Sequence, residues 1–134
     1  MELARLLFEE FQAGQQRGDP GAWFDSEFVA DDYEWVLSDP LDGRSVWRGR
    51  EGFVAFIRTW TEQFEDWSIR VERWIDAGED RVLALTHQSA TGKGSGVPVE
   101  LSLGLIGEFD AGRLARQRVY LTHAEALEAA GLRE

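Results

Sequence analysis

The sequence has no cysteine, only three prolines, and no long apolar segment free of charge. Without cysteine the chain forms neither disulfides nor thiolate metal sites, which is typical of a reducing compartment. No segment approaches the roughly 18 consecutive apolar residues that a membrane-spanning helix requires. The first residues, MELARLLFEEF, are acidic and amphipathic, whereas a secretory leader begins with basic residues. These features predict a cytoplasmic protein that does not enter a membrane.

Positive charge is scarce as well. The chain carries 14 Lys and Arg residues against 25 Asp and Glu residues, which gives a formal net charge of -11. Nucleic acids and anionic membrane surfaces repel a chain of this charge, and no basic run interrupts the acidic background. The sequence therefore predicts neither a nucleic-acid partner nor a membrane partner.

Recognisable metal and cofactor motifs are also missing. The two histidines, His87 and His123, lie far apart in the chain and form neither HExxH nor HxH spacing. The segment GKGSG at 92–96 resembles a phosphate-binding loop, but the following VPVELSL has the pattern of a strand. A phosphate-binding loop needs a helix N-terminus at that point. We therefore expect no metal site and no cofactor.

The composition suits one globular domain over residues 1–134, because 43% of 134 residues are hydrophobic. Apolar residues recur every three to four positions over 2–17, which predicts an amphipathic helix. Asp19 and Pro20 predict the start of a second, short helix. The strongest helical pattern covers 49–64, where large apolar residues share one face: Phe53, Phe56, Ile57, Trp60 and Phe64.

A helix with so many aromatic side chains needs a broad cover, and the rest of the chain has the pattern of strands. Alternation over 33–37 predicts a first strand, and four more are predicted at 67–75, 81–91, 97–109 and 113–121. Turn-rich segments separate these four strands, which indicates an antiparallel meander. Thr122 and Glu125 form a capping box that starts a last short helix.

Alternation within the last two strands predicts which side chains face the core. In the fourth strand of the meander the inward face carries either Gln117 or the pair Arg116 and Arg118. Burying two unpaired arginines would cost roughly several kcal/mol each, so the Gln117 face is expected inside. A three-residue loop at 110–112 gives the hairpin the matching register. The predicted inward residues are Val99, Leu101, Leu103, Leu105 and Phe109 of one strand and Ala115, Gln117, Val119 and Leu121 of the other.

The outward face also carries apolar residues, mixed with Arg116, Arg118 and Glu100. An apolar group of this kind is more typical of a subunit interface than of open surface. We therefore expect a homodimer that forms through the outer sheet face. The apolar residues on this predicted face are Leu83, Leu85, Ile106, Tyr120 and Trp74.

The EWV strand, WRGREGF before the strongest helix, the GKGSG loop, and the final RVYL strand running into AEALEAAGL together resemble the SnoaL-like branch of the NTF2-like superfamily. The resemblance covers essentially the whole chain. It implies an α+β fold, an NTF2-like cone in which a curved antiparallel sheet wraps around a long helix with two N-terminal helices. It also implies an internal ligand pocket and dimers formed through the outer sheet face.

The family includes polyketide cyclases, ketosteroid isomerases, dehydratases and limonene epoxide hydrolases, so the resemblance alone does not select an activity. At the positions where epoxide hydrolases carry their polar and acidic residues, this chain has Trp35, Leu37, Thr86, Gln88 and Val119. A register shift of two on the middle strand would place Val82 and Ala84 there instead. Neither alignment supplies an acid, and the catalytic residues remain unknown.

The favoured interpretation is a pocket that binds a small hydrophobic molecule, oriented by a few hydrogen bonds. The predicted ligand-binding residues are Tyr33, Trp35, Trp60, Thr86, Gln88, Leu101, Leu103, Gln117 and Val119. A filled core in which these groups only satisfy one another is the structural alternative. The functional alternative is a cyclase, isomerase or dehydratase acting on a small carbonyl compound through Tyr33, Gln117 or His87. Alternation places His87 outside, and only a bulge in its strand would turn it inward.

Overall fold

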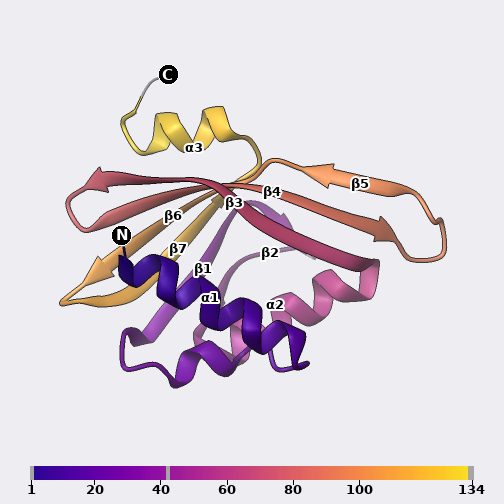
Figure 1. Ribbon diagram of the computed structural model, residues 1–134, viewed down its shortest axis with the longest axis horizontal. Helices are drawn as coiled ribbons and strands as arrows, with labels where there is room; N and C mark the ends of the chain where they lie inside the picture. The colour runs from indigo at the N-terminus through magenta and orange to yellow at the C-terminus, as the bar shows by residue number, and fades with distance from the viewer. Residues whose placement is uncertain (1, 42, 133–134) are drawn as a thin grey trace.

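The structure, a computed structural model, describes residues 2–41 and 43–132 (Figure 1). In chain order the elements are α1 (Glu2–Gln16), the 3-10 turn η1 (Ala22–Asp25), β1 (Val29–Leu41), β2 (Arg44–Arg48), α2 (Gly49–Gln63), β3 (Phe64–Gly78), β4 (Arg81–Gly92), β5 (Pro98–Leu101), β6 (Gly104–Asp110), β7 (Arg113–Tyr120) and α3 (His123–Ala129). No helix in these two ranges is long and apolar enough to cross a membrane.

The strands form one curved sheet in the order β2-β1-β7-β6-β4-β3, and β5 pairs with β4 beside this path. The path is open, with β2 and β3 at its ends. Helices α1 and α2 lie against one face of the sheet, and α3 lies against the other (Figure 1). The fold is thus mixed α and β, as predicted, and the α1 and α2 side of the sheet is its inner face.

The helices differ from the prediction in detail. The predicted helices at 2–17 and 49–64 are confirmed as α1 and α2. Each has 15 residues, so α2 is no longer than α1 and does not stand out as the single long helix that was expected. The second N-terminal helix is a single 3-10 turn. It ends at Ser26, which is extended and whose hydroxyl accepts the Phe28 amide proton. The turn is therefore stopped before Phe28 by a local side-chain bond that competes with helix.

The first strand is longer than predicted, because it begins at Val29 and includes Asp31 and Asp32. The segment 44–48, for which no strand was predicted, is strand β2 and pairs with β1. β1 also pairs with β7 in parallel, so the sheet is mixed and not purely antiparallel. The first and last strands of the chain, β1 and β7, are therefore neighbours in the sheet.

The third strand of the predicted meander, 97–109, is broken into β5 and β6 at Ser102 and Leu103. Both pieces pair with β4, β5 near its end and β6 near its start. At the break the Leu103 carbonyl accepts two bonds from Thr86, at 2.8 Å from its amide and at 2.9 Å from its hydroxyl. A side-chain bond to a main-chain carbonyl of this kind competes with the regular ladder.

In the hairpin between β6 and β7, the side chains from Gln117 onward face as predicted, but the loop differs from the predicted one. Asp110 pairs with Arg113, so the loop has two residues, Ala111 and Gly112, with φ of 52° and 80°. Two positive φ values are typical of a type I′ turn. The register then shifts between the Phe109 to Leu114 pair and the Glu108 to Arg116 pair. This bulge turns Leu114 inward in place of Ala115, and keeps the predicted inward direction from Gln117 onward.

The core has two parts, one on each face of the sheet. The larger part joins α1, η1 and α2 to the inner face. The smaller part lies between the outer face and α3, where Leu83, Leu85 and Ile106 are 0%, 3% and 2% exposed. Leu83, Leu85 and Ile106, three of the apolar residues that suggested a dimer surface, are therefore covered by the chain's own last helix. The homodimer stays a prediction without that support.

Close packing of α3 depends on Gly104 in β6. A Cβ atom at this position would overlap the Cβ of Ala126 in the middle of α3. The helix therefore lies on the sheet at a distance that only glycine permits. Thr122 begins α3 as predicted, since its hydroxyl accepts the Glu125 amide proton at 3.0 Å.

Candidate functional site

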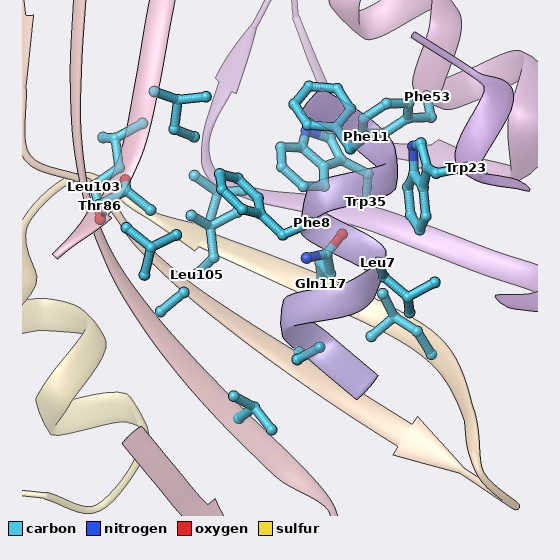
Figure 2. Close-up of a pocket in the computed structure, with 18 of the residues that line it drawn as sticks. Leu7, Phe8, Phe11, Trp23, Trp35, Phe53, Thr86, Leu103, Leu105 and Gln117 are labelled. Atoms are coloured by element: carbon cyan, nitrogen blue, oxygen red, sulfur yellow. Dashed lines mark hydrogen bonds between the residues drawn. The ribbon is translucent and has the colours of Figure 1, made fainter. Parts of the chain in front are cut away.

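A cavity of about 120 Å³ lies between the inner sheet face and the helical layer. Figure 2 shows side chains of α1, among them Leu7 and Phe8, facing the strands that carry Leu103, Leu105 and Gln117. Aromatic and aliphatic side chains make up most of the wall: Leu7, Phe8, Phe11, Trp23, Trp35, Phe53, Phe56, Ile57, Trp60, Trp67, Ile69, Val71, Trp74, Val82, Leu103, Leu105, Phe109, Leu114 and Val119.

Charged side chains are absent from the described residues that line this cavity. Besides the indole N–H groups of its tryptophans, its polar groups are two side-chain amides and one hydroxyl, those of Gln88, Gln117 and Thr86. A buried charge without a partner costs several kcal/mol or more by desolvation, roughly in line with water-to-apolar transfer. The cavity therefore favours an uncharged, mostly apolar occupant.

Gln88 and Thr86 belong to one hydrogen-bonded chain on the inner face of β4. The Trp67 indole donates to Gln88 Oε1 at 2.9 Å, and Gln88 Nε2 donates to Thr86 Oγ1 at 3.3 Å. Thr86 Oγ1 in turn donates to the Leu103 carbonyl. Each of these two polar side chains therefore has partners within the protein, and this series of hydrogen bonds fixes the orientation of both side chains.

Gln117 has a different partner. The Tyr33 hydroxyl donates to Gln117 Oε1 at 2.6 Å. Tyr33 is 0% exposed, and its burial raises the pKa of the phenol well above its ordinary value of 10.0. The phenol therefore keeps its proton at neutral pH, and this proton needs an acceptor.

Most residues predicted to bind a ligand lie on the cavity wall. These are Trp35, Trp60, Thr86, Gln88, Leu103, Gln117 and Val119. Tyr33 is not on the wall and lies behind Gln117, to which it is bonded. Leu101 packs against the core but does not line the cavity, because the chain breaks between β5 and β6 just after it. Their role in ligand binding stays a prediction.

The prediction missed the contribution of α1 and placed Trp74 on the wrong face. Trp67, Ile69 and Val71 alternate regularly into the cavity, but the register of β3 shifts between Val71 and Arg73. The shift turns Trp74 inward, where strict alternation would put it outside. In the sequence, the α1 residues form an amphipathic pattern that indicates only a buried face. A local pattern of this kind does not distinguish a cavity wall from a packed core.

Neither histidine lines the cavity. His87 points outward as predicted, with Nε2 at 3.4 Å from Glu100 Oε1 and Nδ1 at 3.9 Å from Glu72 Oε1. His123 is partly buried, and its Nε2 is 2.9 Å from the Thr86 carbonyl oxygen. The start of α3 is thereby bound to β4. Among the described residues no cluster of three or more acidic or histidine side chains could hold a metal ion.

Three solved structures illustrate how this fold recurs. An NTF2-like protein from Burkholderia pseudomallei is 20% identical, with a TM-score of 0.72 over 92% of this chain and 94% of that one. A protein from Catenulispora acidiphila with a ketosteroid isomerase-like fold, in complex with trimethylamine, is 15% identical, with a TM-score of 0.69 over 95% and 93%. A putative SnoaL-like polyketide cyclase from Mesorhizobium loti is 19% identical, with a TM-score of 0.62 over 90% and 99%.

These likenesses identify the fold class as NTF2-like. The model of the SnoaL-like domain matches residues 8–117, most of the chain, so this chain belongs to the SnoaL-like family. The resemblance noted from the sequence is confirmed. No curated protein gave a sequence match.

Proposed function

We propose that this protein binds a small, uncharged, largely apolar molecule in the cavity between the sheet and the helical layer. The observation that carries the proposal is the lining of the cavity, which is aromatic and aliphatic and whose polar groups are two amides, one hydroxyl and the indole N–H groups of its tryptophans. Apolar walls with a few placed polar groups are the usual construction of small-molecule sites. The Catenulispora relative was crystallised with a small molecule, trimethylamine, and this also supports a binding role for the fold.

The size of the cavity restricts the ligand. Its volume of about 120 Å³ is close to that of an engineered apolar cavity of roughly 150 Å³ that takes up benzene. A ligand built on a single ring matches this space without rearrangement. Larger molecules would require α1 or its side chains to move.

The alternative, a cyclase, isomerase or dehydratase acting on a carbonyl compound, has less support. It draws on names of relatives, such as the putative SnoaL-like polyketide cyclase. Acid-base catalysis needs a titratable group within reach of the ligand. His87 points away from the cavity toward Glu100, and Tyr33 lies off the cavity wall and stays protonated at neutral pH because burial raises its pKa. We therefore favour binding over acid-base catalysis.

Nuclear magnetic resonance tests the binding proposal, because the cavity wall contains several indole groups whose N–H signals report directly. Titration of the full chain with α-methylstyrene, a one-ring hydrocarbon, should shift the indole signals of wall tryptophans such as Trp35 and Trp60. The variant Ala84→Leu places a larger side chain on the wall and should weaken this binding by roughly tenfold or more.

Ala124→Leu is the matched control, since Ala124 is exposed on α3 and the same atoms are added outside the cavity. It should bind the hydrocarbon like the wild type. If the wild type shows no saturable shift of any wall indole, or if the two variants bind equally, the proposal is wrong.

A further inference from the structure

The hydrogen-bonding groups on the cavity wall are unevenly satisfied. The side-chain acceptors are engaged: Gln88 Oε1 receives the Trp67 indole, Thr86 Oγ1 receives Gln88 Nε2, and Gln117 Oε1 receives the Tyr33 hydroxyl. By contrast, Gln117 Nε2 has no hydrogen-bond partner among the described residues. The indole Nε1 atoms of Trp23, Trp35 and Trp60, on the same wall, also lack a partner in the described part of the chain. The wall therefore has donors to offer, and each of these side-chain acceptors already receives one hydrogen bond.

The orientation of the Gln117 amide follows from its neighbour. The oxygen and nitrogen of an amide are assigned from the hydrogen bonds they make. Tyr33 is fully buried and protonated, and Gln117 Oε1 is the only acceptor within reach of its hydroxyl among the described residues. The reversed amide would leave the phenolic proton unpaired in the core, at a cost of desolvation. Tyr33 thus holds the NH2 group of Gln117 away from itself.

There is also room for a ligand beside this amide. Gln117 lies across from Trp35 on β1 and across from Gly107 on β6. Trp35 and Gly107 both line the cavity together with Gln117. The free Nε2 donor therefore borders the cavity.

We propose that Gln117 Nε2 recognises an uncharged acceptor oxygen, the carbonyl of a ketone, aldehyde or ester, on the molecule bound in the cavity. Tyr33 is the positioning residue that orients Gln117 and does not touch the ligand. The proposal rests on the proposed binding function and names the chemical class of the ligand.

The hydrogen-bonding groups of the cavity wall are less suited to other polar ligands. The proton of an alcohol would have to share the wall acceptors Thr86 Oγ1 and Gln88 Oε1, each of which already receives one hydrogen bond. A carboxylate would enter a space whose described lining has no cation to offset its desolvation. A carbonyl oxygen brings an acceptor and no donor, which complements Gln117 Nε2.

A pair of probes of the same shape isolates this hydrogen bond. Acetophenone and α-methylstyrene differ only in a C=O in place of a C=CH2 group. The wild type should bind the ketone roughly three- to tenfold more tightly, the ratio expected from one net hydrogen bond of ordinary strength. The ketone alone should also move the side-chain NH2 signals of Gln117 downfield.

The double variant Tyr33→Phe/Gln117→Leu removes both partners together, so no buried polar group is left unpaired. It should bind the two probes equally while still binding the hydrocarbon. Equal affinities in the wild type, an unmoved Gln117 amide signal, or a preference for the ketone that persists in the double variant would each overturn the assignment to Gln117. In those cases hydrocarbon binding would still uphold the proposed function, whereas failure of both probes to bind would remove the function itself.

Discussion

Glu34 and Arg116 form an ion pair at 2.9 Å, although 82 residues separate them in the chain. They face each other across the parallel pair of β1 and β7, on the outer face of the sheet. Glu34 also accepts from Arg48 at 3.0 Å, and Arg116 donates to Glu108 at 3.2 Å. One chain of charges therefore links β2, β1, β7 and β6, and it satisfies the arginines that alternation placed outside.

The variant Glu34→Gln tests the contribution of this chain of charges. The hydrogen bond from Arg116 lowers the pKa of Glu34 below its ordinary value of 4.5. A lowered pKa means that the carboxylate stabilises the fold above about pH 4.5, and this contribution is lost as the pH falls through the folded-state pKa. Urea unfolding near neutral pH should show a loss of about 1 kcal/mol or less, because the pair is partly exposed.

The pH dependence separates this linkage from a packing effect. As the pH falls from 4.5 through the lowered pKa of Glu34, the free energies of unfolding of wild type and Glu34→Gln should converge. Glu62→Gln provides the control, because Glu62 is exposed on α2 and forms no ion pair that the structure records. A stability difference that stays constant or widens on acidification would argue against the ion pair.

Tyr33→Phe removes the donor to Gln117 and leaves Gln117 Oε1 without its partner. The expected loss of stability is about 1 to 2 kcal/mol. The raised pKa of Tyr33 has the opposite pH sign to that of Glu34. The phenol stabilises the fold below its ordinary pKa of 10.0, and this contribution declines as the pH rises above that value. The gap between wild type and variant, measured by urea unfolding, should therefore narrow in alkali. A gap that widens there would contradict the linkage.

Much of the architecture could be predicted from the sequence, because strong periodic patterns marked α1, α2 and the strands of the meander. The errors in the prediction occur where a bulge adds one residue to a strand, or where a strand is interrupted. The two-residue turn at Ala111 and Gly112 with a bulge after it gives the same parity as the predicted three-residue loop. Parity alone cannot distinguish these arrangements, so Leu114 and Ala115 were assigned to the wrong faces.

The candidate site was predicted where it depends on strand alternation and missed where it depends on tertiary packing. Gln117 and Val119 follow the alternation of β7 and lie on the cavity wall. Trp74 does not, because a register shift in β3 reverses its direction. His123 lies beside the cap of α3, where alternation gives no direction, and only the docking of α3 on β4 brings it to the Thr86 carbonyl.

The contact of Gly104 with α3 gives a sharp test of the second core. In Gly104→Ala the new Cβ would overlap the Cβ of Ala126, and both atoms are held by rigid elements. Overpacking of this kind costs about 1 to 3 kcal/mol, measured by urea unfolding. Gly107→Ala is the control on the same strand, since its Cβ would lie 3.3 Å from the Leu114 Cδ1 atom, which can rotate away. Equal losses in both variants would contradict the close-packing argument.

The Thr86 hydroxyl lies at the break between β5 and β6, where it donates to the Leu103 carbonyl at 2.9 Å and accepts from Gln88. Thr86→Val keeps the shape of the side chain but leaves Gln88 Nε2 without its acceptor, so we expect a loss of about 1 to 3 kcal/mol in urea unfolding. Thr86→Ser retains the hydroxyl and should lose less than Thr86→Val. Thr91→Val, on the same strand but partly exposed and with no recorded hydroxyl bond, should change stability little. If Thr86→Val were as stable as the wild type, the hydroxyl would have no part in fixing the break. The hydrogen bond from the Thr86 backbone N–H to the Leu103 carbonyl would then be enough to hold it.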